Sequence, residues 1–265
     1  MIDNLKLDKT VQFDVIRANE QEFTPGDAEI AAEVPFTIVA NDIELVTLSA
    51  LPSDLKELAY GFLYTSSMIS SASEIKSLWI DETKWRCELQ LETTPDPSLF
   101  TKRLYTSGCG RGVMFSTVGD IVNRKKIECD VKISVSQILA STRALQSSSE
   151  LHKTSGGVHT VALGRSDKLP FMFFDDIGRH NAVDKIIGRS LMDNIDLNSC
   201  ILYTTGRISS DILHKAKKAD IGIIVSLGSP THQVVLTARE FDMTIAGYAR
   251  GKNITIYSCP SRITL

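Results

Sequence analysis

The second half of the chain alternates short apolar runs with polar loops and amphipathic helical patterns, and this alternation most constrains the fold. The predicted strands are residues 171–174, 201–204, 221–227 and 243–248. The first three are each followed by a glycine-containing loop and a helix, a pattern that predicts βαβ units and a largely parallel sheet. Because every polar loop follows a strand, we expect the four loops to meet at the carboxyl edge of the sheet, where open α/β sheets bind ligands.

The N-terminal part of the chain has a shorter, β-rich pattern. Two β-rich runs, residues 31–40 and 43–48, flank Asn41-Asp42, and this arrangement predicts a β-hairpin. A helix is expected to follow, with Ser53 as its N-cap. The apolar stripe of that helix comprises Leu55, Leu58, Ala59, Phe62 and Leu63.

The pattern changes near the middle of the chain. Residues 79–93 predict a further pair of strand segments, and residues 135–145 predict a helix. A chain of 265 residues is long for one domain and short for two large ones. We therefore predict a smaller β-rich N-terminal lobe with one helix over residues 1–100, and an α/β domain over residues 101–265.

Composition and charge narrow the class of partners. Hydrophobic residues make up 43% of the chain and charged residues 23%, an ordinary globular balance. The net charge of −3 gives no general attraction to nucleic acid. The longest apolar run, residues 221–227, is far shorter than the roughly 20 residues of a membrane helix, and residues 1–4 do not resemble a secretion signal. We expect a soluble, cytoplasmic protein with no nucleic-acid or membrane partner.

One of the five cysteines lies in an unusual loop. Cys109 lies between two glycines in the segment Thr-Ser-Gly-Cys-Gly-Arg-Gly, residues 106–112, and glycines give a backbone the freedom to move. Arg111 favours the thiolate, which is the nucleophilic form of cysteine. The loop is compatible with a mobile sulfur carrier, and equally with a small residue in a tight turn or an inert buried thiol. The cysteines show no Cys-x-x-Cys pair and no metal-ligand spacing, so neither a disulfide framework nor a structural zinc is expected.

The loops after the predicted strands carry arginine and hydroxyl side chains. Arg179, Arg207 and Arg250 each lie near a glycine and could form paired hydrogen bonds with a phosphate or with a guanine edge. Helix starts favour anions. Three hydroxyls in these loops either bind phosphate or cap helices: Ser209, Ser210 and Thr231. Neither a P-loop nor G-x-G-x-x-G after a strand is present, which disfavours ATP hydrolysis and dinucleotide redox chemistry. A phosphorylated or nucleotide-like ligand is expected.

Two histidines lie in such loops. His180 follows Asp175 and Asp176, and it is either a proton shuttle or ligand donor, or a helix cap paired with an aspartate. Asp184, one turn later, is expected to hold His180 or Arg179 in place. His159 lies in a glycine-bearing turn, with a functional and a structural role equally open.

Together these loops resemble the FdhD family of sulfur carriers for formate dehydrogenase. The matching segments are residues 33–35, 54–62, 106–112, 155–163, 175–188, 205–210 and 247–251. The most specific is Asp-Ile-Gly-Arg-His-Asn-Ala-Val-Asp-Lys, residues 176–185. The resemblance implies a cytidine-deaminase-like fold, a three-layer α/β/α main domain with the smaller N-terminal lobe. It implies no zinc, and the chain lacks the H-x-E and P-C-x-x-C motifs of zinc deaminases.

The resemblance also implies a function. Cys109 would accept sulfur as a persulfide from a cysteine desulfurase and pass it to a molybdenum or tungsten bis(molybdopterin guanine dinucleotide) cofactor, which is then delivered to the catalytic subunit of formate dehydrogenase. The segment matching the family's cofactor-binding residues is Tyr248, Ala249, Arg250, Gly251, Lys252 and Asn253. Further expected contacts are Arg179, His180, Arg207 and Ser209. The family resemblance implies a homodimer.

One departure from the family pattern bears on the chemistry. Many members have Cys-x-x-Cys in this loop, whereas this chain has Gly112 at the second position, so the loop has no second thiol. Transfer through Cys109 alone remains chemically sufficient, because a persulfide needs one thiolate and an access path. The alternative is a chaperone that binds the cofactor and carries no sulfur. A zinc hydrolase or deaminase is disfavoured for want of ligands.

Overall fold

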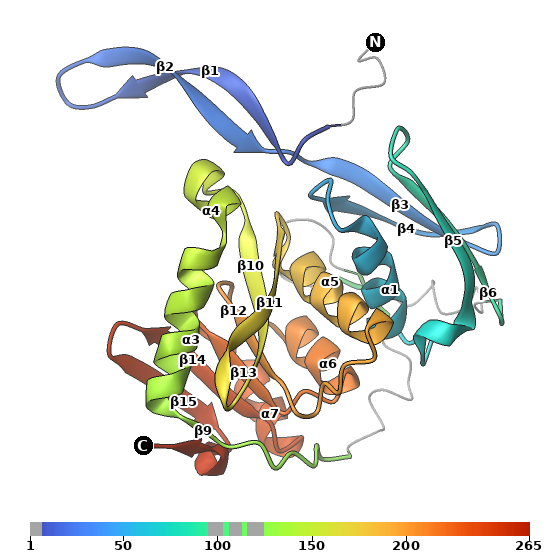
Figure 1. Ribbon diagram of the computed structural model, residues 1–265, viewed down its shortest axis with the longest axis vertical. Helices are drawn as coiled ribbons and strands as arrows, with labels where there is room; N and C mark the ends of the chain where they lie inside the picture. Colours follow the sequence, from blue (N-terminus) through green and yellow to red (C-terminus); the bar gives the residue numbers. More distant parts are fainter. Residues whose placement is uncertain (1–6, 95–102, 106–112, 116–124) are drawn as a thin grey trace.

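The computed structural model describes residues 7–94, 103–105, 113–115 and 125–265, so Cys109 and the rest of the loop 106–112 lie outside the described residues. The centre of the molecule is a six-stranded sheet with the strand order β11-β10-β12-β13-β14-β15 (Figure 1). Its strands are β10 (His159–Arg165), β11 (Lys168–Asp176), β12 (Ile201–Thr204), β13 (Ile223–Ser226), β14 (Thr244–Arg250) and β15 (Asn253–Ser258).

The sheet is mixed, and the expectation of a largely parallel sheet is wrong. Strands β12, β13 and β14 run parallel, but the pairings β11–β10, β10–β12 and β14–β15 are antiparallel. The reason is that hairpins extend the parallel core on both sides. The β10–β11 hairpin was missed because its first strand, His159–Arg165, begins in a segment that was interpreted only as a glycine-bearing turn.

Helices cover both faces of this sheet, so the domain has three layers. They are α3 (Val135–Ser148), α5 (Arg179–Met192), α6 (Ser210–Lys218) and α7 (His232–Glu240). Side chains alternate between two cores along each strand. In β12, Leu202 packs in the core beneath α5, α6 and α7, whereas Tyr203 packs with α3 on the opposite face. The α/β class is therefore confirmed, and the closer likeness to the cytidine deaminase fold stays a prediction.

A second, four-stranded sheet lies beside the first, with the order β4-β3-β6-β5. Its strands are β3 (Val34–Ala40), β4 (Ile43–Ala50), β5 (Ile75–Asp81) and β6 (Arg86–Leu91). Asn41 and Asp42, with φ of 47° and 64°, form the two-residue turn between β3 and β4. Positive φ at both turn residues is typical of the tight turn that matches strand twist, so the predicted hairpin is confirmed.

Helix α1 (Leu55–Thr65) covers this sheet and buries the predicted apolar stripe. The expected N-cap is wrong by one residue, since the cap is Asp54 and not Ser53. The amide of Ser53 donates to the carbonyl of Leu51 at 2.7 Å, which closes a tight turn. Asp54 then adopts φ 54°, and the helix begins only after it.

Helix α1 also packs directly on α5, and two glycines permit the close approach. A Cβ atom added to Gly61 would lie 1.8 Å from the carbonyl oxygen of Asp184. One added to Gly188 would lie 2.0 Å from the carbonyl oxygen of Glu57. The two helix backbones are therefore in contact, and α1 joins the smaller sheet to the larger one.

The first described residues form a long hairpin that projects from the body (Figure 1, blue). It consists of β1 (Thr10–Ala18) and β2 (Phe23–Ala31), and we call residues 10–31 the arm. Near the base of the arm, the Cβ atom of Ala31 lies 3.3 Å from the position that a Cβ on Gly157 would occupy, just after helix α4 (Glu150–Ser155). In the described part of the chain, no helix has the length and apolar character needed to cross a membrane.

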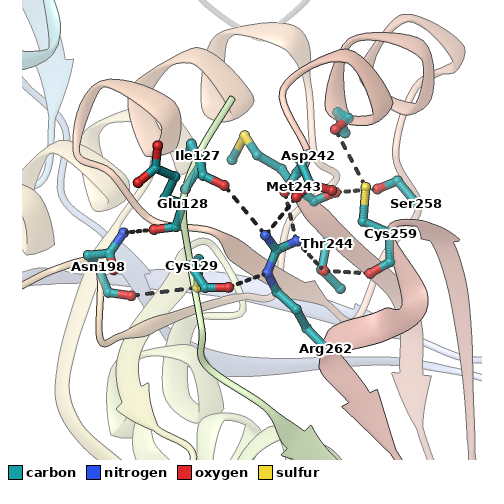
Figure 2. Close-up of polar contacts among 11 residues, drawn as sticks. Ile127, Glu128, Cys129, Asn198, Asp242, Met243, Thr244, Ser258, Cys259 and Arg262 are labelled. Atoms are coloured by element: carbon teal, nitrogen blue, oxygen red, sulfur yellow. Dashed lines mark hydrogen bonds and ion pairs between the residues drawn. The ribbon is translucent and has the colours of Figure 1, made fainter. Parts of the chain in front are cut away.

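Arg262, near the C-terminus, ties three segments together (Figure 2). Its Nε donates to the carbonyl of Cys129 at 2.8 Å, and its Nη1 donates to the carbonyl of Asp242 at 2.7 Å. Its Nη2 also pairs with the Asp242 carboxylate at 3.0 Å. This buried guanidinium fixes the segment 127–129, which runs toward α3, against the loop that precedes β14.

Candidate functional site

The loops that follow β11, β12, β13 and β14 contact one another at the carboxyl edge of the large sheet. A Cβ on Gly206 would lie 3.1 Å from Cδ of Arg179, and one on Gly228 would lie 3.4 Å from Cα of Arg207. The amide of Tyr248 donates to the carbonyl of Gly228 at 2.9 Å. The expected meeting of the four loops is confirmed, because each loop touches the next.

Three helices begin at this edge. Their N-caps are Gly178 for α5, Ser209 for α6 and Thr231 for α7, and none of the three forms a side-chain cap hydrogen bond. The hydroxyls of Ser209 and Thr231 thus stand at cap positions without capping. Helix starts present free N–H donors and a partial positive charge, which suits an anionic ligand.

His180 is held by two side chains from α6 and the loop before it. Its Nε2 lies 3.1 Å from Oγ of Ser209 and 3.5 Å from Oδ2 of Asp211. Burial lowers the pKa of His180 to about 4, although Asp211 opposes that shift. The imidazole is therefore neutral near pH 7. Asp211 was not among the predicted site residues, because its only signal in the sequence was its place in the polar run after Arg207.

Asp184 has a different role from the one expected. It lies on the same face of α5 as His180, but its carboxylate accepts hydrogen bonds from Nζ of Lys215 and from Oγ1 of Thr65, each at 2.8 Å. The prediction that Asp184 holds His180 or Arg179 is wrong, because a buried ammonium on α6 is the stronger partner. Since Thr65 ends α1, this buried network also joins α1, α5 and α6.

Asp175 and Asp176 likewise pair away from His180. Asp175 accepts hydrogen bonds from the hydroxyls of Thr160 and Ser149, each at 2.6 Å. Asp176 is fully buried and pairs with Nζ of Lys185 at 2.7 Å. Asp176 also accepts the amide of Leu51 at 3.2 Å and Nδ2 of Asn181 at 3.0 Å. Asp176 thus fixes the start of α5 and ties it to the segment that leads into α1, whereas Asp175 joins β11 to β10 and to the start of α4.

A hollow of about 600 Å³ opens beside the loops. Its walls include Leu145 of α3, His152 of α4, His159 at the start of β10, and Thr205 after β12. Nδ1 of His159 lies 3.3 Å from the position of a Cβ on Gly206, so His159 borders both the hollow and the loop edge. Burial lowers the pKa of His159, and the charge of Arg179 lowers it further. The sequence patterns did not predict this hollow, because its walls come from four separate elements.

The predicted segment 248–253 forms the end of the β14–β15 hairpin at the same edge. Tyr248 is 45% exposed, and the Arg250 guanidinium lies 5.7 Å from the centre of its ring. Gly251 turns the chain with φ 65°, and Lys252 and Asn253 are exposed beside it. Ala249 is fully buried in the core, so it can offer a ligand only its backbone.

The four described cysteines are poor nucleophiles. Burial raises the pKa of the Cys87 thiol to about 12, and burial together with the Asp242 carboxylate raises that of Cys259 to about 11. Burial also raises the pKa of Cys200, and Cys129 is buried with its Sγ 3.7 Å from the carbonyl of Asn198. Little thiolate forms at pH 7 when the thiol pKa is raised. Within the described ranges, no three His, Cys, Asp or Glu side chains are grouped to hold a metal ion.

The fold and the site define an α/β protein with arginine-bearing, helix-starting loops gathered at one edge of its sheet. The FdhD/NarQ family model matches residues 31–264, and the chain belongs to this family. The resemblance noted in the sequence is thereby confirmed.

Relatives across most of the chain carry a functional name. The sulfur carrier protein FdhD of Bacillus pumilus is 38% identical over 247 residues, which is 92% of this chain and 94% of the relative. The protein of the same name from Bacillus subtilis is 34% identical, over 94% of this chain and 96% of the relative. A crystal structure of a formate dehydrogenase accessory protein from Desulfotalea psychrophila superposes with a TM-score of 0.78 at 25% identity, covering 96% of this chain and 99% of that one.

Proposed function

We propose that this protein is a sulfur carrier in the maturation of formate dehydrogenase. Cys109 accepts sulfur as a persulfide from a cysteine desulfurase. The sulfur then passes to a molybdenum or tungsten bis(molybdopterin guanine dinucleotide) cofactor, which is the substrate, before that cofactor is inserted into the enzyme. Membership of the FdhD/NarQ family and the names of the relatives support the general role.

The assignment of sulfur transfer to Cys109 rests on the burial and the raised thiol pKa values of the other cysteines. All four are buried or partly buried, and raised thiol pKa values at Cys87, Cys200 and Cys259 suppress the thiolate that must attack a persulfide. Only Cys109 has glycines on both sides and an arginine two positions later. It is therefore the best candidate among the five for carrying sulfur.

The two sulfur-transfer steps differ in whether they require a reductant. In the first, the Cys109 thiolate attacks the outer sulfur of the donor persulfide, the donor S–S bond breaks, and the donor cysteine leaves as a thiolate. In the second, the outer sulfur leaves Cys109 as sulfide, which requires two electrons as the S–S bond breaks. With Gly112 at the second position, the loop has no second cysteine to supply them, and we propose an external thiol as the reductant.

The loop edge suits the guanine dinucleotide ends of the cofactor. Arg179 and Arg207 can form paired hydrogen bonds with phosphate, and the starts of α5, α6 and α7 offer N–H donors nearby. His180 is neutral there and can accept or donate a hydrogen bond without adding charge. We assign Ser209 and the segment 248–253 to the same binding edge.

We also propose where the protein acts and which partners it has. The protein acts in the cytoplasm, receives sulfur from a cysteine desulfurase and delivers the cofactor to the catalytic subunit of formate dehydrogenase. It works as a homodimer and has no nucleic-acid or membrane partner.

Intact-mass spectrometry tests the carrier role. After incubation with a cysteine desulfurase and cysteine, without reductant, the protein gains the mass of one sulfur atom, and peptide mapping places it on Cys109. The variant Cys109→Ala loses the gain, whereas the control Cys259→Ala, which removes a partly exposed thiol of the described part of the chain, keeps it. An added thiol then removes the sulfur as sulfide.

A second candidate is a cofactor chaperone in which Cys109 carries no sulfur, and Gly112 favours it because the loop lacks a second thiol. No mass gain in the wild type, or sulfur spread over all five cysteines, would contradict the carrier. Formate dehydrogenase maturation that survives Cys109→Ala, with cofactor binding intact, would establish the chaperone instead.

A further inference from the structure

We infer that Asp211 fixes which ring nitrogen of His180 carries the proton, so that the other nitrogen accepts a hydrogen bond from the ligand. His180 then recognises a hydrogen-bond donor, either a ribose hydroxyl or the N–H groups of a guanine base, and does not bind phosphate. Asp211 is a positioning residue, because it acts through His180. The inference rests on the proposed function, which places the guanine dinucleotide ends of the cofactor at the loop edge.

The two partners of His180 differ in what they permit. Nε2 of His180 lies 3.1 Å from Oγ of Ser209 and 3.5 Å from Oδ2 of Asp211. A hydroxyl can donate or accept, so Ser209 is compatible with either form of the neutral ring. An ionised carboxylate can only accept, and it repels the lone pair of an unprotonated nitrogen. Asp211 therefore requires the proton to lie on Nε2, which leaves the lone pair on Nδ1.

The surroundings of Asp211 keep its carboxylate ionised and in place. Asp211 lies in the first turn of α6, where the free N–H groups of a helix favour a negative charge. Burial opposes the shift, but the carboxylates of Asp184 and Asp211 raise the pKa of Lys215, one turn further along α6. Lys215 also pairs with Asp184 of α5 at 2.8 Å. Two neighbouring contacts thus join α5 to α6 and hold Asp211 against His180.

The neutral state of the ring makes the choice of nitrogen decisive. Burial lowers the pKa of His180 to about 4, and the charges of Arg179 and Lys215 lower it further, although Asp211 opposes them. A neutral imidazole has one donor and one acceptor, whereas a charged one has two donors. With the donor directed at Ser209 and Asp211, the ring has only an acceptor left for a ligand.

The covered end of the ring is the Nε2 end. Ser209 and Asp211 are both buried, whereas 16% of the His180 side chain remains exposed. Among the described residues, no hydrogen bond reaches Nδ1. Since His180 is the second residue of α5, its ring lies at the loop edge. Nδ1 is thus the polar atom of this ring that remains for a ligand.

An acceptor at this position separates the groups of a guanine nucleotide into two classes. Phosphate oxygens at neutral pH are mainly acceptors, so the Nδ1 lone pair repels them, and they are left to the arginines and the helix starts. The ribose hydroxyls and the N1–H and 2-amino groups of guanine are donors, and each can bind Nδ1. Asp211 therefore makes His180 selective for the nucleoside part of the ligand.

Nitrogen-15 NMR of the histidine rings in the full chain tests the action of Asp211. His180→Gln identifies the His180 signals by their absence, and the wild type is expected to carry the proton on Nε2. Asp211→Asn shows both forms of the ring, because an amide can donate as well as accept. Asp211→Glu restores the wild-type form, and Ser209→Ala keeps it.

Glu57→Gln is the matched control, since it removes a first-turn carboxylate from α1 and should leave the His180 signals unchanged. A wild-type ring protonated on Nδ1 would overturn the inference, whether or not any variant folds. An Asp211→Asn spectrum identical to that of the wild type would overturn it as well.

Titration calorimetry with three probes tests the class of ligand group. Asp211→Asn weakens binding of guanosine diphosphate by roughly threefold, because only the fraction of molecules with a free Nδ1 accepts the donor. Binding of inorganic pyrophosphate, which lacks the nucleoside, is unchanged. If 2′,3′-dideoxyguanosine diphosphate is weakened too, the donor is on the base, and if it is not, the donor is a ribose hydroxyl.

Two results of the titrations would contradict selectivity for the nucleoside. These are an unchanged affinity of Asp211→Asn for guanosine diphosphate, and an equal loss for pyrophosphate. A wild type that binds no guanosine diphosphate while Nε2 is protonated would instead contradict the proposed binding edge. Sulfur loading of the wild type reports separately on the carrier role.

Discussion

His180 belongs to α5, but its hydrogen-bonding partners come from α6 and the loop before it. Ser209 and Asp211 both approach Nε2, so this nitrogen carries the proton in the neutral ring and Nδ1 is left as an acceptor. Because burial holds the pKa near 4, the ring contributes no charge at pH 7. The positive charge of the loop edge therefore comes from arginine and lysine side chains such as Arg179, Arg207 and Arg250, and the histidine sets hydrogen-bond geometry.

The buried neutral state of His180 predicts a pH dependence of stability. The pKa is lowered from 6.5 to about 4, so between these values the unfolded chain binds a proton that the folded chain does not. The free energy of unfolding therefore falls as pH drops from 6.5 toward 4, by at most about 3 kcal/mol. Urea unfolding at several pH values measures this, and His180→Gln flattens the decline. An equally steep decline in the variant would assign it to other groups.

Arg207 is exposed, so its role can be tested without loss of stability. We expect Arg207→Ala to weaken binding of guanosine diphosphate, which represents one end of the cofactor, by roughly tenfold through loss of a charge-assisted contact. Titration calorimetry measures the affinity. Arg239→Ala is the control, because Arg239 lies at the other end of α7 and should leave the affinity unchanged. Equal affinities for wild type and Arg207→Ala would remove Arg207 from the site.

At the residue scale, the sequence identified types of side chain better than their partners. The arginines and His180 lie at the loop edge as predicted from their positions after strands. Asp184 was assigned to His180 because both lie on one helix face, but Lys215 comes from another helix 31 positions away. Asp211 was missed for the same reason. Local spacing fixes which face a residue occupies, whereas the pairing depends on which helix packs there.

Helices α1 and α5 form the closest element contact that joins the two sheets. Gly61 and Gly188 permit the backbones to touch, and the buried Lys215–Asp184 ion pair lies alongside with Thr65. A buried pair of this kind adds little net stability, but losing one partner leaves an uncompensated charge. The packing of α1 on α5 is therefore stabilised mainly by the close fit of the two backbones, and less by the buried ion pair.

Gly188→Ala tests the shape requirement. The added methyl group would lie 2.0 Å from the Glu57 carbonyl and 2.6 Å from the Gly61 amide, so α1 must move. We expect a loss of about 3 kcal/mol or more in the free energy of unfolding. Gly156→Ala is the comparison, since that site has φ 65° but no atom within 4 Å, and strain alone costs about 1 kcal/mol. Chemical denaturation measures both, and similar small losses would refute the close crossing.

At the element scale, strands and helices with strong local patterns were predicted well. The β3–β4 hairpin, α1 and α3 follow from turn chemistry and apolar periodicity. Strand β10 and the arm were missed. Strand β10 begins one residue after two glycines and was interpreted by its polar start. The arm alternates weakly because both of its faces are largely exposed to solvent. Apolar periodicity in a sequence reflects which face of an element is buried, so it gives a weak signal where neither face is buried.

At the scale of the whole molecule, the strand-to-helix order predicted the α/β class and the ligand edge but not the strand order. Antiparallel hairpins added at both sides of the parallel strands come from pairings that no single segment encodes. The packing of the small sheet on the large one also escaped prediction. Its determinants, such as the Asp176 carboxylate that receives the Leu51 amide, join residues 125 positions apart.

The contact between Gly61 and Gly188 also constrains how sequences in this lineage can change. Neither position can acquire a side chain while the helices keep their separation, so a substitution at one site is tolerated only after a compensating shift of the other helix. That shift would move the start of α5, which carries Arg179 and His180. Substitutions at Gly61 and Gly188, which lie away from the ligand edge, are thereby limited by the need to keep that edge in place. The two positions should change together or not at all.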